Sequence, residues 1–355
     1  AFRRRQRITA TGKEFISRLR SRKPGFLFAR RRFNEEDNDR KRGDGPRRVG
    51  SRAALRRRVS RNALDGDSRK PRDAGVYSEW ATNEKVALEA AAGASIAGAR
   101  ALAAMKHVGL NVAADPLFTL AYTGVNGGLV IVSADDPGLF SSQNEQDNRF
   151  YASHAKIAMV EPSDSQECLD YVKEAFEISE KFDTPVLFRV TTRICHSKTL
   201  VETGERIERE VRPYKKDVTK YVMAPANAKR RKQILTERIA ALKEYSETTP
   251  LNRVERGEGK IGIITSGISY NHAKEVFGGE ASYLKLGFTW PLPERKIRDF
   301  AASVETLYVI EENEPYLENF VKSLGIACTG REKLPWIDEL TPERVRRAFF
   351  PESEE

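Results

Sequence analysis

From residue 77 onward, short apolar runs alternate with polar turns and with longer segments of helical period. The runs at 128–133, 157–160 and 186–190 are apolar at nearly every position, which is typical of parallel strands buried on both faces. A helix predicted from Pro162 to about Lys181 separates the second run from the third. This strand–helix–strand order predicts an α/β layer with parallel strands.

A second series of elements follows a charged stretch, 191–226, that shows no regular period. A helix predicted at 227–245 leads into this second series. The series itself consists of predicted strands at 261–267, 283–287 and 306–312 and a predicted helix at 315–324. We therefore predict two three-layer α/β domains with parallel sheets, at 77–225 and 260–355. A helical linker at 226–259 joins them, and an arm at 1–76 precedes them.

The densest cluster of helix, turn and loop signals lies between residues 79 and 154. A helix predicted from about Asn83 to Ala104 is rich in small residues, and a helix so apolar on nearly all sides is usually buried. Thr82 or Asn83 can cap it, and Glu84 in its first turn suits the positive end of the helix dipole. A polar turn, a second helix, a strand and an amide-rich loop are predicted to follow.

Charge divides the chain into a basic arm and an acidic body. Residues 1–76 contain 25 Lys and Arg but 9 Asp and Glu, a net charge of +16. The remaining 279 residues therefore carry −6, because the whole chain has a net charge of +10. No sustained helical or strand period runs through the arm. We predict that the arm is disordered.

Three interpretations of the arm remain open. A basic segment can bind nucleic acid through phosphate contacts, although we regard this partner as the less favoured one. A transit peptide is poor in acidic residues, whereas four of them cluster at 35–39. We prefer a coding region translated out of frame, because the Arg-rich, pattern-free sequence ends abruptly at Tyr77, where the family resemblance described below begins. The triplet Gly43-Asp44-Gly45 matches a metal-binding Gly-Asp-Gly motif that normally follows an apolar strand. No apolar strand precedes it here, so we interpret the match as chance.

Cysteine usage and hydropathy exclude several classes of protein. The three cysteines, Cys168, Cys195 and Cys328, lie far apart and form no Cys-x-x-Cys pair, so the chain predicts no metal site and no iron–sulfur cluster of its own. Isolated thiols fit the reducing cytoplasm. No apolar run reaches the length of a membrane span, and no signal-peptide core is visible. We therefore predict a cytoplasmic protein without a membrane segment.

The run EKVALEAAAGASIAGARALAAMKHVGLNVAADPLFTLAYTGVNGG begins at Glu84, and SSQNEQDNRFYA begins at Ser141. Together they resemble the pyrimidine-binding domain of the indolepyruvate ferredoxin oxidoreductase alpha subunit, in the thiamine-diphosphate-dependent 2-oxoacid:ferredoxin oxidoreductase group. The resemblance covers residues 77 to about 350. It implies a thiamin-diphosphate-binding pyrimidine-type fold, followed from residue 260 by a transketolase C-terminal-like domain that is mostly structural in that group.

The resemblance also implies a reaction: oxidative decarboxylation of an aryl 2-oxo acid, such as indolepyruvate, to an aryl-acyl-CoA. Thiamine diphosphate with Mg²⁺ is the implied cofactor, and family 4Fe-4S clusters pass the electrons to ferredoxin. The implied partners are ferredoxin, a beta subunit, CoA and the aryl pyruvate, in a dimer or heteromer. This chain lacks the family's opening strand with its Gly-Thr-Pro type loop, the diphosphate-binding domain and the cluster cysteines. We therefore expect an incomplete polypeptide whose metal and clusters are held elsewhere.

The resemblance assigns the central chemistry to Glu84. In thiamine-diphosphate enzymes, a glutamate of the pyrimidine domain hydrogen-bonds the aminopyrimidine ring nitrogen, which promotes loss of the thiazolium C2 proton. A carboxylate suits this role because it is ionised and acts only as an acceptor. Without the resemblance, Glu84 would be interpreted as a first-turn residue that serves the helix dipole. Glu79 precedes the cap and Glu89 lies five residues on, so both are poorer candidates.

Three further residues lie in the polar turn predicted after the long helix: His107, Gly109 and Asn111. This turn resembles the cofactor-facing loop of the family, which implies that the three residues help to bind cofactor, with His107 as a neutral imidazole. A turn histidine bonded to the backbone is the equally open alternative. The other histidines, His154, His196 and His272, are predicted to be structural or solvated.

The amides of Gln143, Asn144 and Gln146 can donate hydrogen bonds to the carboxylate or enolate oxygen of a keto acid. Ordinary loop polarity explains them equally well. Three alternatives to the indolepyruvate enzyme also remain. They are an alpha subunit for another 2-oxo acid, an inactive partner subunit that keeps the pyrimidine fold, and a nucleic-acid-binding protein led by the basic arm.

Overall fold

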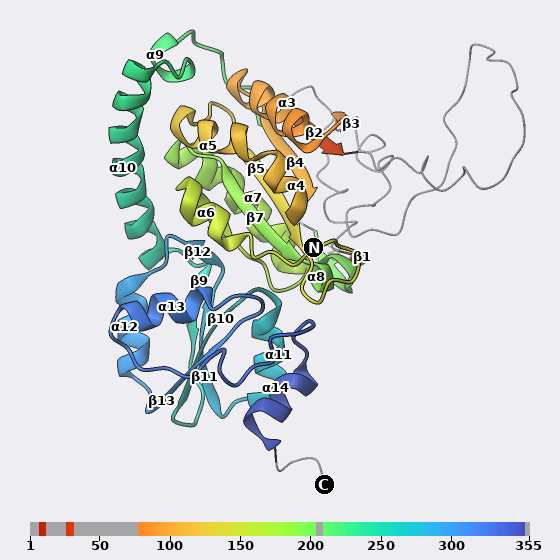
Figure 1. Ribbon diagram of the computed structural model, residues 1–355, viewed down its shortest axis with the longest axis vertical. Coiled ribbons are helices and arrows are strands. Elements are labelled where there is room, and N and C mark those ends of the chain that lie inside the picture. Colours follow the sequence, from red (N-terminus) through yellow and green to blue (C-terminus); the bar gives the residue numbers. More distant parts are fainter. Residues whose placement is uncertain (1–6, 12–25, 32–76, 204–208, 352–355) are drawn as a thin grey trace, which may run out of the picture.

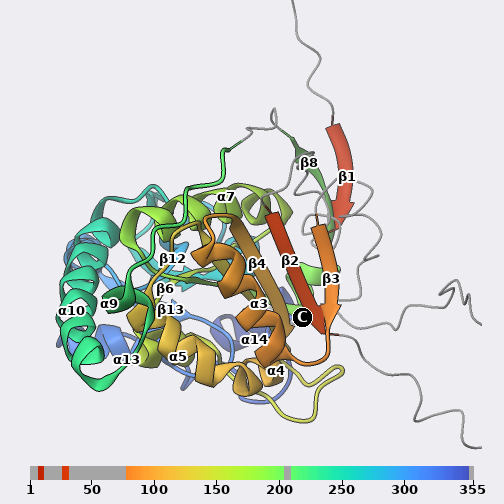
Figure 2. The ribbon, with the colours of Figure 1, turned by 90° about the horizontal axis from the view of Figure 1, so that it is seen from above.

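The computed structural model describes residues 7–11, 26–31, 77–203 and 209–351. Two α/β units follow one another along the chain, and each has helices on both faces of a central sheet (Figure 1). This confirms the fold class predicted from the sequence. A small antiparallel sheet of β1 (Arg7–Thr11) and β8 (Lys198–Glu202) lies at the edge of the first unit (Figure 2).

Seven strands form the first sheet, in the order β12-β6-β7-β5-β4-β2-β3. All neighbours pair in parallel except β12, which runs antiparallel to β6. The strands are β2 (Phe26–Arg31), β3 (Tyr77–Ala81), β4 (Arg100–Lys106), β5 (Leu129–Asp135), β6 (Ala158–Val160), β7 (Val186–Thr191) and β12 (Phe288–Trp290). Every residue of β5 and β7 is buried, as their apolar runs predicted.

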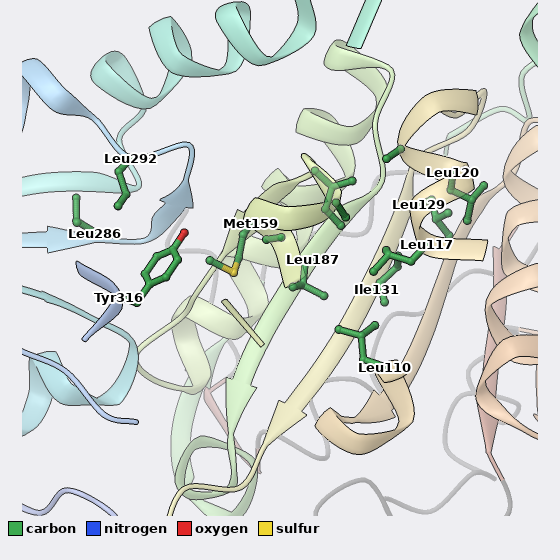
Figure 3. Packing of buried hydrophobic residues seen from close by; sticks show 14 of the residues in the cluster. Leu110, Leu117, Leu120, Leu129, Ile131, Met159, Leu187, Leu286, Leu292 and Tyr316 are labelled. Carbon is green, nitrogen blue, oxygen red and sulfur yellow. The ribbon is translucent and has the colours of Figure 1, made fainter. Parts of the chain in front are cut away.

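Helices cover both faces of this sheet. Leu117 and Leu120 of one helix pack beside Leu129 and Ile131 of β5 (Figure 3). The face that includes these residues is covered by α3 (Glu84–Ile96), α5 (Ala114–Thr123) and α6 (Arg149–Ala155). The opposite face is covered by α7 (Ser165–Phe182) and α10 (Pro225–Thr248). The described part of this unit also contains three short helices: α4 (His107–Val112), α8 (Thr192–His196) and α9 (Val218–Tyr221).

The long helix α10 runs along the side of the first unit to the second (Figure 1). The second sheet has the order β13-β10-β11-β9, with β9 antiparallel to β11. Its strands are β9 (Asn252–Glu255), β10 (Ile261–Ser266), β11 (Ala281–Leu286) and β13 (Thr306–Ile310). One face packs on α11 (Gly267–Phe277) and α14 (Pro342–Phe349), the other on α12 (Glu294–Ala302) and α13 (Tyr316–Ser323). Leu286 and Tyr316 of this unit belong to the same core cluster as the first sheet (Figure 3).

The predicted helix from Asn83 to Ala104 was wrong beyond Ile96. The α-helix ends at Ile96, and Gly98 follows with a φ of +100°, a conformation that residues with a side chain rarely adopt. The chain then enters β4, a nearly fully buried strand between β2 and β5. Its alanines favour helix as single residues, but pairing on both sides overrides that preference. The turn predicted at 107–111 is also wrong, because these residues lie in α4.

Two segments of the arm form strands that the sequence pattern did not predict. β2 pairs in parallel with both β3 and β4, and β1 pairs with β8. Arg-rich sequence around the short apolar run at 26–29 hid this strand. The rest of the arm, including the Gly43-Asp44-Gly45 triplet, lies outside the described residues. Among the helices that the structure describes, each is too short or too polar to cross a bilayer.

Candidate active site

Glu84 is the first residue of α3 and follows the carboxyl end of β3. Its N-cap is Asn83, whose side-chain oxygen accepts a hydrogen bond of 2.9 Å from the N–H of Val86. The cap sets the start of the helix and turns the glutamate inward, so that it is only 3% exposed. Glu79 is half-buried within β3, and Glu89 is exposed. Glu84 is therefore the buried acid of the three candidates.

The carboxylate of Glu84 lies directly against Gly109 of α4. A β-carbon at position 109 would come within 2.6 Å of Glu84 Cγ and 2.8 Å of its Oε1. A side chain at position 109 would force the Glu84 side chain to shift, so the observed position of Glu84 depends on glycine at 109. The structure thus brings together two residues that lie 25 positions apart and were both predicted from the sequence as site residues.

The ring of His107 is fully buried at the start of α4. Its Nε2 lies 3.0 Å from the carbonyl oxygen of Asn144, and its Nδ1 lies 3.4 Å from that of Ala134. Both ring nitrogens therefore face backbone acceptors, which matches the alternative of a histidine bonded to the backbone. The imidazole joins α4 to the end of β5 and to the loop that follows.

Asn111 lies on α4 two residues beyond Gly109, which places the two on nearly opposite sides of the helix. Asn111 is exposed, and its side-chain oxygen accepts a 2.6 Å hydrogen bond from the hydroxyl of Tyr151 on α6. Of the three α4 candidates, Gly109 contacts Glu84, His107 supports the loop, and Asn111 faces α6.

The three amide candidates lie in the loop of residues 136–148, here called the amide loop, which joins β5 to α6. Gln143 and Asn144 are exposed, and Gln146 donates a 2.8 Å hydrogen bond to the side-chain oxygen of Asn144. Since β3, β4, β5 and β7 are parallel, Glu84, α4 and the amide loop all follow strand ends at the same edge of the sheet. Ligands of α/β folds bind at this edge.

Two residues that the sequence analysis missed hold the amide loop in place. Lys106, at the end of β4, donates a 2.6 Å hydrogen bond to the carbonyl oxygen of Ser141. Asp136 accepts hydrogen bonds from the N–H of Ser141 and the hydroxyl of Ser142, at 2.9 and 2.6 Å. Burial opposes ionisation of Asp136, but these donors, with Thr192 and the charge of Lys106, hold its pKa below the ordinary value. The sequence did contain a signal for these two residues, because Lys106 ends one buried strand and Asp136 directly follows another.

A buried ion network, also missed, lies behind the loop. Arg189 of β7 donates to Asp135 at 2.7 Å and to Glu161 at 2.8 Å. Arg149, the first residue of α6, pairs with Asp147 and with Glu311 of the second unit. Burial disfavours the charge of Arg149, yet these two carboxylates outweigh it and raise its pKa well above the ordinary value. In the sequence, such charged residues look like ordinary surface positions.

Comparison with protein families and with known proteins shows which family the chain belongs to. Residues 66–255, just over half of the 355, match the family model described as "Pyruvate flavodoxin/ferredoxin oxidoreductase, thiamine diP-bdg". A solved 2-oxoglutarate:ferredoxin oxidoreductase from Magnetococcus marinus superposes with a TM-score of 0.71 at 15% identity, covering 96% of this chain and 65% of that chain. At that identity the likeness shows the fold alone.

Two curated relatives are much more similar in sequence. The indolepyruvate oxidoreductase subunit IorA of Archaeoglobus fulgidus is 45% identical over 256 residues, which are 71% of this chain and 41% of that protein. The same subunit of Methanothermobacter marburgensis is 43% identical over 290 residues, which are 78% of this chain and 47% of that protein. The chain thus spans about half the length of the curated relatives it matches. It belongs to the thiamine-diphosphate-binding family of pyruvate flavodoxin/ferredoxin oxidoreductases.

Proposed function

We propose that this chain supplies the pyrimidine-binding part of an indolepyruvate:ferredoxin oxidoreductase, in which Glu84 activates thiamine diphosphate. The observation that carries the proposal is the buried carboxylate of Glu84 against Gly109, at the edge of the sheet where ligands bind. The two relatives named for indolepyruvate support an aryl 2-oxo acid as the substrate. The neighbour that binds 2-oxoglutarate marks the alternative substrate class.

The residues around Glu84 fit the pyrimidine ring of this cofactor. Gly109 lacks a side chain, so the backbone of α4 can pack directly against the buried carboxylate. Glu84 would accept a hydrogen bond from the ring nitrogen and hold a proton there, as an anion on a rigid helix end does best. When bound, thiamine diphosphate would supply the nucleophilic carbon and the electron sink that decarboxylation of a 2-oxo acid needs.

The amide loop is the proposed site of contact with the 2-oxo acid. Gln143 and Asn144 present exposed amides at the same edge of the sheet as Glu84 and can donate to a carboxylate. Gln146 would orient Asn144 through their mutual hydrogen bond. His107 would fix the position of the amide loop through the contact of its ring with the carbonyl oxygen of Asn144. Asn111 is the weakest of the proposed contacts, because it faces α6.

We propose that Mg²⁺ and the 4Fe-4S clusters are held outside this part of the enzyme. The described residues include no group of His, Cys, Asp or Glu that could hold a metal ion. Cys168 and Cys195 are buried, and Cys328 is half-buried. The chain matches 41% and 47% of the two relatives, and we propose that a diphosphate-binding region lies in the part of such a protein that this chain does not match. Ferredoxin, a beta subunit and CoA are the proposed partners, in the cytoplasm.

The test uses the complete enzyme, meaning this chain within its full-length polypeptide together with the beta subunit. Ferredoxin reduction is measured with indolepyruvate, phenylpyruvate, pyruvate and 2-oxoglutarate in the presence of thiamine diphosphate, Mg²⁺ and CoA. The proposal expects the two aryl substrates to give the highest kcat/KM. A preference for 2-oxoglutarate would assign the chain to the other substrate class, and inactivity with all four would favour an inactive partner subunit. Salt-sensitive binding of nucleic acid that is lost when the basic residues of 32–76 are neutralised, with β2 left intact, would support the arm-led alternative.

A further inference from the structure

Arg149 connects the amide loop to the second unit. Its side chain is 1% exposed, and its Nε lies 2.9 Å from Oδ1 of Asp147. One terminal nitrogen donates to Glu311 Oε2 at 2.6 Å, and the other donates to the carbonyl oxygens of Glu312 and Glu314 at 2.8 and 2.9 Å. One guanidinium therefore binds the last residues of the loop and the segment of residues 311–314 at once.

The second unit holds this guanidinium from several directions. Glu311 accepts backbone hydrogen bonds from Leu317 and Glu318, at 2.9 and 3.0 Å, and so caps the start of α13. The ring of Tyr316 lies 5.0 Å from the guanidinium carbon, as in a cation–π contact. Because Glu311 is fixed by the helix it caps, Arg149 has little freedom to move relative to α13.

The contact continues from the loop to the position of Glu84. Asn148, between Asp147 and Arg149, is 1% exposed and donates from its side chain to the carbonyl oxygen of His107 at 3.1 Å. Its own N–H donates to Asp135 at 3.0 Å. His107 begins α4, and Gly109 on that helix lies against Glu84. An unbroken series of contacts therefore runs from α13 through Arg149 and Asn148 to the site.

We infer that Arg149 is a positioning residue through which the second unit fixes the amide loop and, by way of Asn148 and α4, the place of Glu84. A guanidinium is needed because it donates in one plane to a carboxylate and to two carbonyls, which an ammonium cannot do. The second unit then contributes to the site through the contacts of Arg149. This coupling is a property of the chain, and its effect on turnover rests on the proposed function.

Hydrogen–deuterium exchange on the full chain tests the coupling without cofactor. We compare Arg149→Met and Arg149→Lys with wild type, and use Arg193→Met as the matched control. Arg193 also bridges the two units, to Glu339, but its side chain is 50% exposed. We expect Arg149→Met to speed exchange in α4 and at Ser141 and Asn148 by about 10-fold or more, because local opening is a separate equilibrium from global unfolding.

In the same experiment, α7 is expected to exchange as in wild type, Arg149→Lys to lie between wild type and Arg149→Met, and Arg193→Met to leave α4 unchanged. Unchanged exchange in α4 and the loop of Arg149→Met overturns the inference. Equal acceleration in every element overturns it too, because that result means general destabilisation. The exchange rates of α4 and of the amide loop are both measured without any substrate.

Steady-state kinetics of the complete enzyme provide a second, independent test of the inference. Arg149→Lys is expected to lower kcat about 100-fold, the scale of a displaced catalytic group, with little change in KM for the 2-oxo acid. Glu84→Gln serves as the reference for the site. A wild-type kcat in Arg149→Lys, in an enzyme that Glu84→Gln inactivates, overturns the inference. If Glu84→Gln is itself fully active, the proposed function fails, and exchange alone decides on the coupling.

Discussion

Glu84 and Gly109 fit together because one has a buried carboxylate and the other has no side chain. The place that a β-carbon of residue 109 would take lies 2.6 Å from Glu84 Cγ. We expect Gly109→Ala to keep the fold, since alanine favours helix, but to displace the carboxylate and lower kcat of the complete enzyme by about 100-fold. Steady-state kinetics and circular dichroism measure the two effects.

The control for this substitution is Gly93→Ala. Gly93 lies in the middle of α3, the helix of Glu84, and a β-carbon there meets no atom within 4 Å. It is expected to leave kcat unchanged and to raise the free energy of unfolding by roughly 0.5–1 kcal/mol. Equal activity of the two variants would show that the carboxylate has room to shift without loss.

Glu84→Gln is expected to keep the fold and most cofactor binding while nearly abolishing turnover. An amide has the size of the carboxylate, and the lost charge at the helix start costs about 0.3–1 kcal/mol of stability. It cannot stabilise a protonated ring nitrogen, so C2 proton exchange of bound thiamine diphosphate, followed by NMR, is expected to slow about 100- to 10,000-fold. The exposed Glu89→Gln serves as control. Wild-type exchange in Glu84→Gln would move the role to another acid.

Glu312 is expected to make stability depend on pH. Burial, opposed by Arg189 and the Leu340 N–H, raises its pKa from 4.5 to about 7. Between these values the folded state binds more protons than the unfolded state, so this contribution to stability is lost as pH rises from about 4.5 to 7. Glu312→Gln cannot ionise and retains an oxygen for the Leu340 N–H. It is expected to be more stable than wild type at pH 8 by roughly 3 kcal/mol, and similar at pH 4.5.

Urea denaturation at several pH values measures this difference. The control is Glu275→Gln, which changes an exposed acid on α11 and is expected to leave the pH dependence unaltered. A Glu312→Gln variant that keeps the wild-type slope between pH 4.5 and 7 would place the buried proton on another group of the network.

The cap of α3 is a simpler test of local structure. Asn83→Ala removes the acceptor of the Val86 N–H and is expected to cost about 1 kcal/mol in the free energy of unfolding. The exposed neighbour Thr82 was the other cap candidate, and Thr82→Ala is expected to stay within roughly 0.5 kcal/mol of wild type. A larger loss in Thr82→Ala would reverse the assignment of the cap.

The sequence predicted those elements whose burial shows in residue type. β5 and β7 are buried on both faces and consist largely of branched apolar residues, so their runs are unmistakable. β4 is buried almost as deeply, but three of its seven residues are alanine and most of it was predicted as helix. Burial of β4 follows from its neighbours in the sheet, which a local pattern does not contain.

The site shows the same division. Glu84 was identified through the family motif, because a first-turn glutamate looks the same whether it serves the helix dipole or a cofactor. Its contact with Gly109 depends on how α3 packs on α4. Arg149 was missed because its partner Glu311 lies 162 residues away, and an arginine without a visible partner is assigned to the surface.

Strand β12 belongs by sequence to the second unit, yet it forms the outer strand of the first sheet against β6. It is only three residues long, its register shifts between Phe288 and Trp290, and Pro291 follows it at once. Short, irregular, proline-bounded edges resist pairing with other chains. If this strand were removed, β6 would present its unpaired N–H and C=O groups to solvent. By covering the edge of β6, the second unit therefore protects the first sheet from pairing with other chains and aggregating. The two units are expected to unfold in one cooperative transition.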